Sequence, residues 1–168
     1  MPIVTSHEEP HLLELRTDVV RPEWIDYNGH MNVAYYVLAF DYATDAFLDH
    51  IGLSREFKES VNSTTFALDM NVSYKREVLE GDPLRFTTQL IDVDEKRLHF
   101  FHQMFHATEG YLSATNEVLS VHVDLDTRRI APMPDALRQR VGAVWDLHRN
   151  LPKPDAVGRT LGIRRKTT

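Results

Sequence analysis

The chain has 168 residues, 42% of them hydrophobic and 26% charged, which is typical of one globular domain. It contains no cysteine, so disulfides, thiol nucleophiles, iron–sulfur clusters and cysteine zinc sites are excluded. If the protein is an enzyme, its catalytic groups must therefore be acids, bases or hydroxyls. The formal net charge of −6 argues against general nucleic-acid binding.

No stretch of the sequence approaches the roughly 18 consecutive apolar residues that a membrane helix needs. Residues 1–11 lack a basic region followed by an apolar run, so we predict no secretion signal and a cytoplasmic protein that binds no membrane. Charge is uneven along the chain, because residues 152–168 carry five basic side chains and one acid. This pattern predicts a single domain over residues 1–151, followed by a solvated basic tail; the alternative is a tail that binds phosphate.

The first half of the domain is expected to form one strand and one long helix. The strand covers residues 12–20 and ends before Pro22, because proline cannot donate to a strand ladder. After the loop EWIDYNGHMN, apolar residues recur mostly every three or four positions over residues 33–51. This period predicts a helix that buries one face, with Asn32 as its N-cap and Gly52 at its C-terminal end.

The second half alternates with period two and predicts strands. The first covers residues 64–74, with its apolar side chains on one face: Phe66, Leu68, Met70, Val72 and Tyr74. Three more are expected at residues 84–91, 97–107 and 112–125, and the short breaks between consecutive strands require antiparallel pairing. A last helix is expected from about residue 134 to 150. Together these elements predict an α+β fold, a meander of long antiparallel strands wrapped around the central helix, plus a C-terminal helix.

Polar and special residues gather in the loop before the long helix: Asp26, Tyr27, Asn28, Gly29, His30 and Asn32. A helix N-terminus presents unpaired backbone N–H groups and about half a positive charge, so it can polarise a carbonyl or hold an oxyanion. Asp26, just upstream, is then placed to act as a general base toward water or as a nucleophile. The alternative interpretation is that Asp26 and Asn28 only cap the turn while His30 packs.

The order of a strand, the motif D-x-x-G-H-x-N, a long helix and a meander resembles the 4-hydroxybenzoyl-CoA thioesterase branch of the hot-dog fold. This resemblance implies a hot-dog fold and an acyl-CoA thioesterase that needs no cofactor or metal. It also implies a homodimer or homotetramer with sites built from two subunits. By the same resemblance, Asp26 is the catalytic carboxylate and the backbone N–H of Val33 is the oxyanion donor, while His30 and Asn32 shape the loop.

A narrower similarity points to the acyl group. Three segments are similar to the thioesterase domain fused to some L-carnitine dehydrogenases, thought to act on betainyl-CoA: residues 26–32, 94–102 and 113–124. After Asn32 the chain departs from that domain with VAYYVLAF, which leaves the acyl group open. We expect these residues to line the substrate site: Tyr27, Gly29, His30, Asn32, Tyr35 and Tyr36. With Trp24, the tyrosines favour a small acyl group, and betainyl is the first to test because aromatic faces attract cations. The alternative is that Tyr36 belongs to the core and Trp24 anchors the loop.

Three histidines need a separate interpretation. His99, His102 and His106 would align for a metal on a helix, but on the expected strand His102 and His106 share one face and His99 takes the other, so no metal site is predicted. His99 or His102 could be a partner of the acid across a subunit boundary, or could simply pack. Taken as a set, basic residues at strand ends and turns form a candidate surface for the coenzyme A phosphates, although each one alone is expected to be a solvated surface charge: Lys75, Arg76, Lys96, Arg97, Arg128 and Arg129.

Two other functions are compatible with the same fold. One is an acyl-CoA-binding module that binds without turnover. The other is a hot-dog dehydratase or hydratase, which removes or adds a proton beside the carbonyl.

Overall fold

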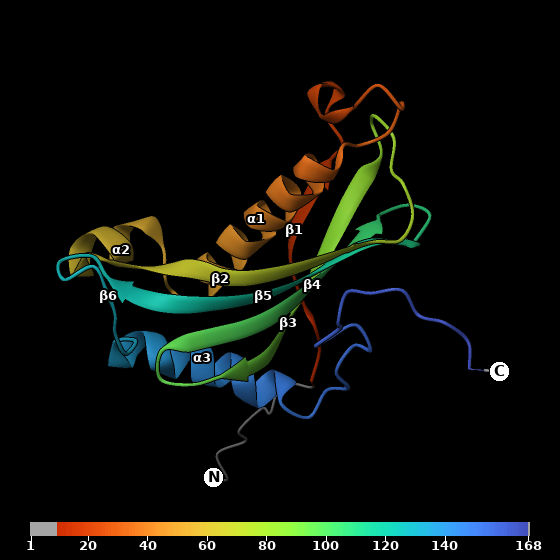
Figure 1. Cartoon of the computed structure of the whole chain (residues 1–168). Coiled ribbons are helices and arrows are strands. Elements are labelled where there is room, and N and C mark those ends of the chain that lie inside the picture. The colour runs from red at the N-terminus through yellow and green to blue at the C-terminus, as the bar shows by residue number, and fades with distance from the viewer. Residues whose placement is uncertain (1–9, 168) are drawn as a thin grey trace, which may run out of the picture.

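The computed structural model describes residues 10–167, so residues 1–9, where no secretion signal is predicted, lie outside it. Within this range six antiparallel strands form one curved sheet around a long helix (Figure 1). The elements in chain order are β1 (Leu13–Val19), a 3-10 helix (Pro22–Trp24), α1 (Val33–His50), α2 (Arg55–Val61), β2 (Ser63–Tyr74), β3 (Pro83–Val93), β4 (Arg97–His106), β5 (Leu112–Asp124), β6 (Arg129–Ile130) and α3 (Asp135–His148). The α+β class is confirmed. No described helix is long and apolar enough to cross a membrane.

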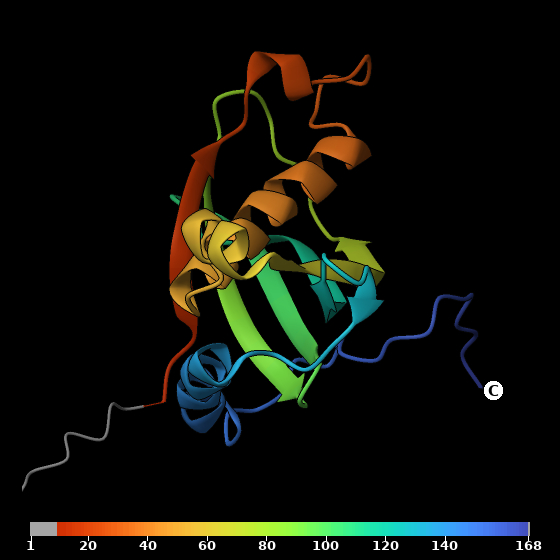
Figure 2. The same cartoon turned by 90° about the vertical axis from the view of Figure 1, so that its left-hand side faces the viewer.

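Helix α1 lies in the concave side of the sheet (Figure 2). The Asn32 side chain caps it by accepting the Ala34 N–H at 2.9 Å, as predicted, and Gly52 follows its end with a φ of +87°. The buried face of α1 meets aromatic side chains of the strands, with ring centroids 5.2 Å apart for Phe47 and Phe100. Each such side chain contributes roughly 1.5–3 kcal/mol when it leaves water, so this face fixes α1 on the sheet.

The strand order is β1-β3-β4-β5-β2, with β6 beside β5. The predicted meander is therefore wrong for β2 and β3, because β2 lies at the sheet edge, three strand positions from β3. Three steps of roughly 4.8 Å make about 14 Å, and an eight-residue connection can span up to roughly 27 Å. We call this connection, Lys75–Asp82, the crossing loop. It passes over the end of the sheet beside the start of α1 (Figure 1).

Strand β2 contains a bulge that the sequence pattern did not reveal. Its pairing with β5 shifts register between Ala67 and Asp69, so Leu68 is an extra residue. Beyond the bulge Tyr74 faces α1, whereas Phe66 faces the opposite side, and the prediction that the five apolar residues share one face is wrong. Phe66 and Leu68 remain 49% and 53% exposed at the free edge of the sheet.

Two short elements were not predicted. In α2 no residue is buried, so no apolar stripe marks it in the sequence. Strand β6 has only two residues, Arg129 and Ile130, and pairs with the end of β5. The predicted C-terminal helix is confirmed as α3, which packs along β3 and ends at His148.

After α3 the chain crosses the outer face of the sheet, opposite α1 (Figure 2). We call residues 152–159 the C-terminal strap. Side chains from three strands hydrogen-bond to it: Gln89, Glu117 and Asn71. The sequence predicts a solvated tail for the whole of residues 152–168. Residues 152–159 instead hydrogen-bond to the sheet, whereas residues 160–167 beyond them are exposed.

Candidate active site

The Asp26 loop, residues 25–32, is a closed turn directly before α1. The Gly29 N–H donates to the Asp26 carbonyl oxygen at 3.0 Å, and the Asp26 N–H donates to the His30 carbonyl oxygen at 3.2 Å. Gly29 has a φ of +84°, a conformation that other residues rarely adopt. The Asp26 Oδ1 accepts the Asn28 N–H at 2.8 Å, while no described residue donates to Oδ2. The turn therefore holds the carboxylate by one oxygen and leaves the other available.

The start of α1 lies next to this loop and is open to solvent. Val33 is the first helical residue, and its N–H has no acceptor within the helix. The Asn32 side chain caps the following N–H instead, and the Val33 side chain is 59% exposed. The positive end of α1 can hold a developing negative charge here, and Asp26 can supply a base or a nucleophile from the same turn.

The predicted aromatic residues divide into buried and open ones. Trp24 is 2% exposed and stacks on Tyr35, with ring centroids 5.9 Å apart. Tyr36 is also buried and meets Tyr74 edge-on at 5.1 Å. Tyr27 is 97% exposed at the tip of the loop. Trp24 and Tyr36 therefore belong to the core, as the alternative interpretation expected, whereas Tyr27 and part of Tyr35 remain open to a ligand.

Tyr74 joins the site from β2 and was not among the predicted site residues. Its hydroxyl donates to the Val33 carbonyl oxygen at 3.2 Å, which places the end of the free sheet edge against the helix start. Burial raises the pKa of Tyr74, and nearby Tyr36 raises it further. The pKa of Tyr36 is also raised, mainly by burial. Both hydroxyls therefore stay protonated at neutral pH and can act as hydrogen-bond donors.

The crossing loop borders the Asp26 loop on its other side. The Met31 N–H donates to the Val78 carbonyl oxygen at 3.0 Å. The His30 Nε2 lies 3.7 Å from a carboxylate oxygen of Glu77. These contacts fasten the second half of the Asp26 loop to the crossing loop.

Two of the three β4 histidines, His102 and His99, lie in different environments. His102 is fully buried, with Nδ1 2.8 Å from the Thr88 hydroxyl and Nε2 2.9 Å from the Thr44 hydroxyl. Burial lowers the pKa of His102 to about 3, so it is a neutral, packed histidine. His99 lies on the outer face, with Nε2 3.0 Å from Glu117 Oε2. The described residues contain no group of three or more histidine, aspartate or glutamate side chains that could hold a metal.

The six basic residues proposed as one coenzyme A surface lie at opposite ends of the sheet, so that prediction is wrong. Arg76 follows β2 near the start of α1, whereas Arg97 and Arg128 lie near the β3–β4 turn and β6 (Figure 1). The Arg76 guanidinium lies 3.8 Å from the centre of the Tyr111 ring. Of the six residues, Lys75 and Arg76 are the two that belong to the crossing loop, which borders the Asp26 loop.

Comparison with known proteins identifies the family. A family model described as the thioesterase-like superfamily matches residues 20–141. The chain belongs to this superfamily. A betainyl-CoA thioesterase of Pseudomonas aeruginosa is 38% identical over 161 residues, which are 96% of each chain. An L-carnitine dehydrogenase/betainyl-CoA thioesterase of Rhizobium meliloti is 33% identical over 153 residues, covering 91% of this chain and 31% of that protein.

Solved structures share the fold of this chain. A hypothetical protein from Staphylococcus aureus in complex with CoA has a TM-score of 0.86 and 29% identity, covering 94% of this chain and 98% of that one. A structure from Pseudomonas putida has a TM-score of 0.78 and 32% identity, covering 92% of this chain and 99% of that one. The predicted family and hot-dog fold are confirmed.

Proposed function

We propose that the chain is an acyl-CoA thioesterase that hydrolyses betainyl-CoA, with Asp26 and the Val33 N–H as its reacting groups. The observation that carries the proposal is the closed turn that joins a carboxylate to an open helix start in a thioesterase-like superfamily member. The choice of acyl group is supported by the relative described as a betainyl-CoA thioesterase, which aligns over 96% of each chain.

The reaction uses these groups as follows. The thioester carbonyl oxygen accepts a hydrogen bond from the Val33 N–H, and the helix dipole stabilises the negative charge that develops on it. Asp26 then either removes a proton from the water that attacks the carbonyl carbon, or attacks that carbon itself to form an anhydride that water cleaves. Both routes break the carbon–sulfur bond and release coenzyme A and a carboxylic acid.

Open aromatic rings near the loop support a small cationic acyl group. Tyr27 and part of Tyr35 are accessible beside the helix start. A quaternary ammonium over such a face gains roughly 0.5–2 kcal/mol, depending on how far it is desolvated. The test compares kcat/KM for betainyl-CoA with kcat/KM for neutral short-chain and long-chain acyl-CoAs. A long-chain substrate that wins by more than about tenfold, roughly 1.4 kcal/mol, would contradict this choice of acyl group.

The proposal includes a homodimer that pairs the free edges of two β2 strands; a homotetramer would then be a pair of such dimers. Phe66 and Leu68 are exposed along this edge, and an unpaired edge invites pairing about a two-fold axis. Because Tyr74 links the same edge to Val33, pairing would bring a second chain beside the open helix start. Light scattering at micromolar concentration tests this, and a monomer would contradict it.

Product analysis separates the proposal from its alternatives. Incubation with a panel of acyl-CoAs and a thiol reagent should release free coenzyme A. Tight binding without release would favour an acyl-CoA-binding module, whereas a changed acyl chain with an intact thioester would favour a dehydratase or hydratase. The cytoplasmic location stays a prediction.

A further inference from the structure

The crossing loop holds both ends of the chain segment that carries the candidate site. At the start of this segment, the Gly81 N–H donates to the Val20 carbonyl oxygen at 2.9 Å, and the Val20 N–H donates to the Asp82 carbonyl oxygen at 3.0 Å. At its end, the Met31 N–H donates to the Val78 carbonyl oxygen at 3.0 Å. Residues 21–30 therefore lie between two contacts with one loop, and Trp24 among them is buried in the core. A displacement of the crossing loop would change the position of Asp26 relative to the start of α1.

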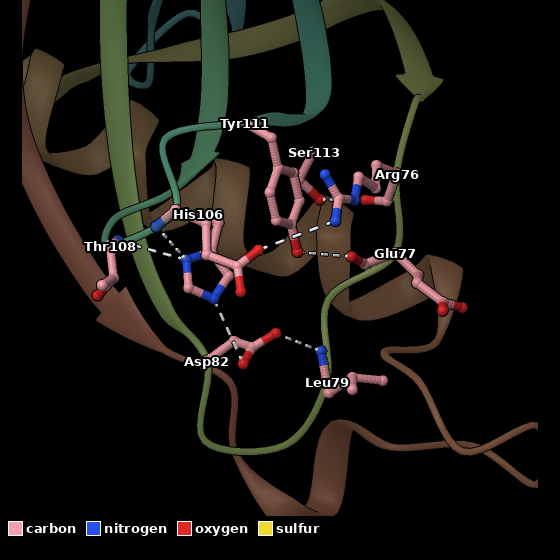
Figure 3. A network of polar contacts seen from close by, with 9 residues as sticks. Arg76, Glu77, Leu79, Asp82, His106, Thr108, Tyr111 and Ser113 are labelled. Carbon is pink, nitrogen blue, oxygen red and sulfur yellow. Dashed lines mark hydrogen bonds and ion pairs between the residues drawn. The ribbon is translucent and has the colours of Figure 1, made fainter.

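Asp82 and His106 fix the turn of the crossing loop (Figure 3). Asp82 Oδ2 accepts the Leu79 N–H at 2.8 Å, and Asp82 Oδ1 lies 3.4 Å from the Nε2 of the buried His106. On its other side, His106 Nδ1 accepts the N–H groups of Glu109 at 3.0 Å and Thr108 at 3.3 Å. A ring nitrogen that accepts hydrogen bonds carries no proton, so the neutral ring keeps its proton on Nε2, which faces Asp82.

The first part of the crossing loop is attached to the same hairpin (Figure 3). The Tyr111 hydroxyl donates to the Glu77 carbonyl oxygen at 2.9 Å, and the Ser113 hydroxyl donates to the Arg76 carbonyl oxygen at 2.7 Å. The β4–β5 hairpin therefore supports the crossing loop at both ends. His106 is the point at which the hairpin turn meets Asp82.

We propose that His106 is a positioning residue for thioester hydrolysis. It joins the β4–β5 turn to Asp82, and the crossing loop passes this constraint to Val20 and Met31, which lie on either side of Asp26 in the chain. The inference rests on the proposed roles of Asp26 and Val33, which His106 does not contact in the structure. A misplacement of about 1 Å at a reacting group can lower a rate by roughly 10²-fold. Loss of the constraint should therefore lower kcat more than it weakens substrate binding.

Two variants of His106 test the proposal, and each keeps the contacts of only one ring nitrogen. His106→Asn ends near Nδ1 and keeps an acceptor for the hairpin amides, whereas His106→Gln ends near Nε2 and keeps a donor for Asp82. His122 provides a matched control: it is also buried, and its Nδ1 lies 3.0 Å from the Ala131 carbonyl oxygen, near β6 and far from the Asp26 loop. We expect His122→Asn to lower the melting temperature without changing kcat. His106→Asn, which no longer reaches Asp82, should lower kcat by about tenfold with KM within about twofold, whereas His106→Gln should keep kcat near that of the wild type.

Amide hydrogen exchange supplies a readout that does not depend on activity. His106→Asn should speed exchange of the Met31 N–H and of residues 21–34, while His106→Gln and His122→Asn should leave them protected. Unchanged exchange in His106→Asn would overturn the proposal, and so would faster exchange in that variant with kcat equal to that of His122→Asn. Asp26→Asn, assayed in parallel, tests the proposed function separately: it should lower kcat and leave the Met31 N–H protected.

Discussion

His102 should make the stability of the protein depend on pH. Its imidazole is fully buried, and burial lowers its pKa from the ordinary 6.5 to about 3. Below pH 6.5 the unfolded chain takes up a proton at this residue, whereas the folded chain does not. The contribution of His102 is therefore fully present above pH 6.5 and is lost as the pH falls toward 3. Each pH unit corresponds to about 1.4 kcal/mol, so 1.5 units below 6.5, at pH 5, about 2 kcal/mol should be lost.

His102→Gln isolates this effect. The variant removes the titrating ring and keeps an amide that can reach the hydroxyls of Thr44 and Thr88. Urea unfolding at pH 8 should show the variant less stable by roughly 2–3 kcal/mol, because a buried hydrogen-bonded side chain is replaced imperfectly.

The decisive quantity is the difference in unfolding free energy between wild type and variant. Carboxylates titrate in both proteins, and so does His148, whose pKa is also lowered by burial, so their effects cancel. The difference should shrink by about 2 kcal/mol from pH 8 to pH 5. A difference that changes by less than about 0.5 kcal/mol would refute the assignment of a neutral, buried His102.

Three further predictions concern the site, the sheet edge and the strap. Asp26→Asn should lower kcat by about 10²-fold with an unchanged circular dichroism spectrum, because the base or nucleophile is lost; near-normal turnover would remove Asp26 from the mechanism. Leu68→Lys should convert the proposed dimer to a monomer in sedimentation experiments, and an unchanged dimer mass would exclude this edge as the interface. Arg159→Ala should lower stability by about 1–2 kcal/mol, or roughly 2–8 °C in melting temperature, because its guanidinium loses a 2.7 Å hydrogen bond to Asn71. An unchanged melting temperature would show that this contact does not contribute.

Local sequence signals predicted the individual helices and strands better than they predicted which strands lie side by side. The helix α1 was predicted from apolar residues repeated every three or four positions, and its cap from Asn32. Both signals depend on residues close in the chain, and both predictions are confirmed. The bulge at Leu68 depends on how β2 pairs with β5, about fifty positions later, so the alternation of β2 alone could not reveal it. The edge position of β2 likewise depends on the strand order of the whole sheet.

The same distinction applies to the candidate site. The Asp26 loop is a compact motif whose turn, glycine and helix cap are all local. Tyr74 contacts Val33 across 41 positions, and no periodic pattern connects them. The contact of His106 with Asp82 becomes visible only once the path of the crossing loop is known.

The C-terminal strap has a consequence for the kinetics of folding. Its hydrogen bonds join residues 63 positions apart for Gln89 and Pro152, and 88 positions apart for Asn71 and Arg159. We expect these contacts to form after the sheet, because together they lie across three strands of it and join residues distant in sequence. Interactions that are absent from the folding transition state slow unfolding and leave the folding rate almost unchanged. The strap should therefore lengthen the lifetime of the folded chain, and a strap variant should unfold faster while refolding at the wild-type rate.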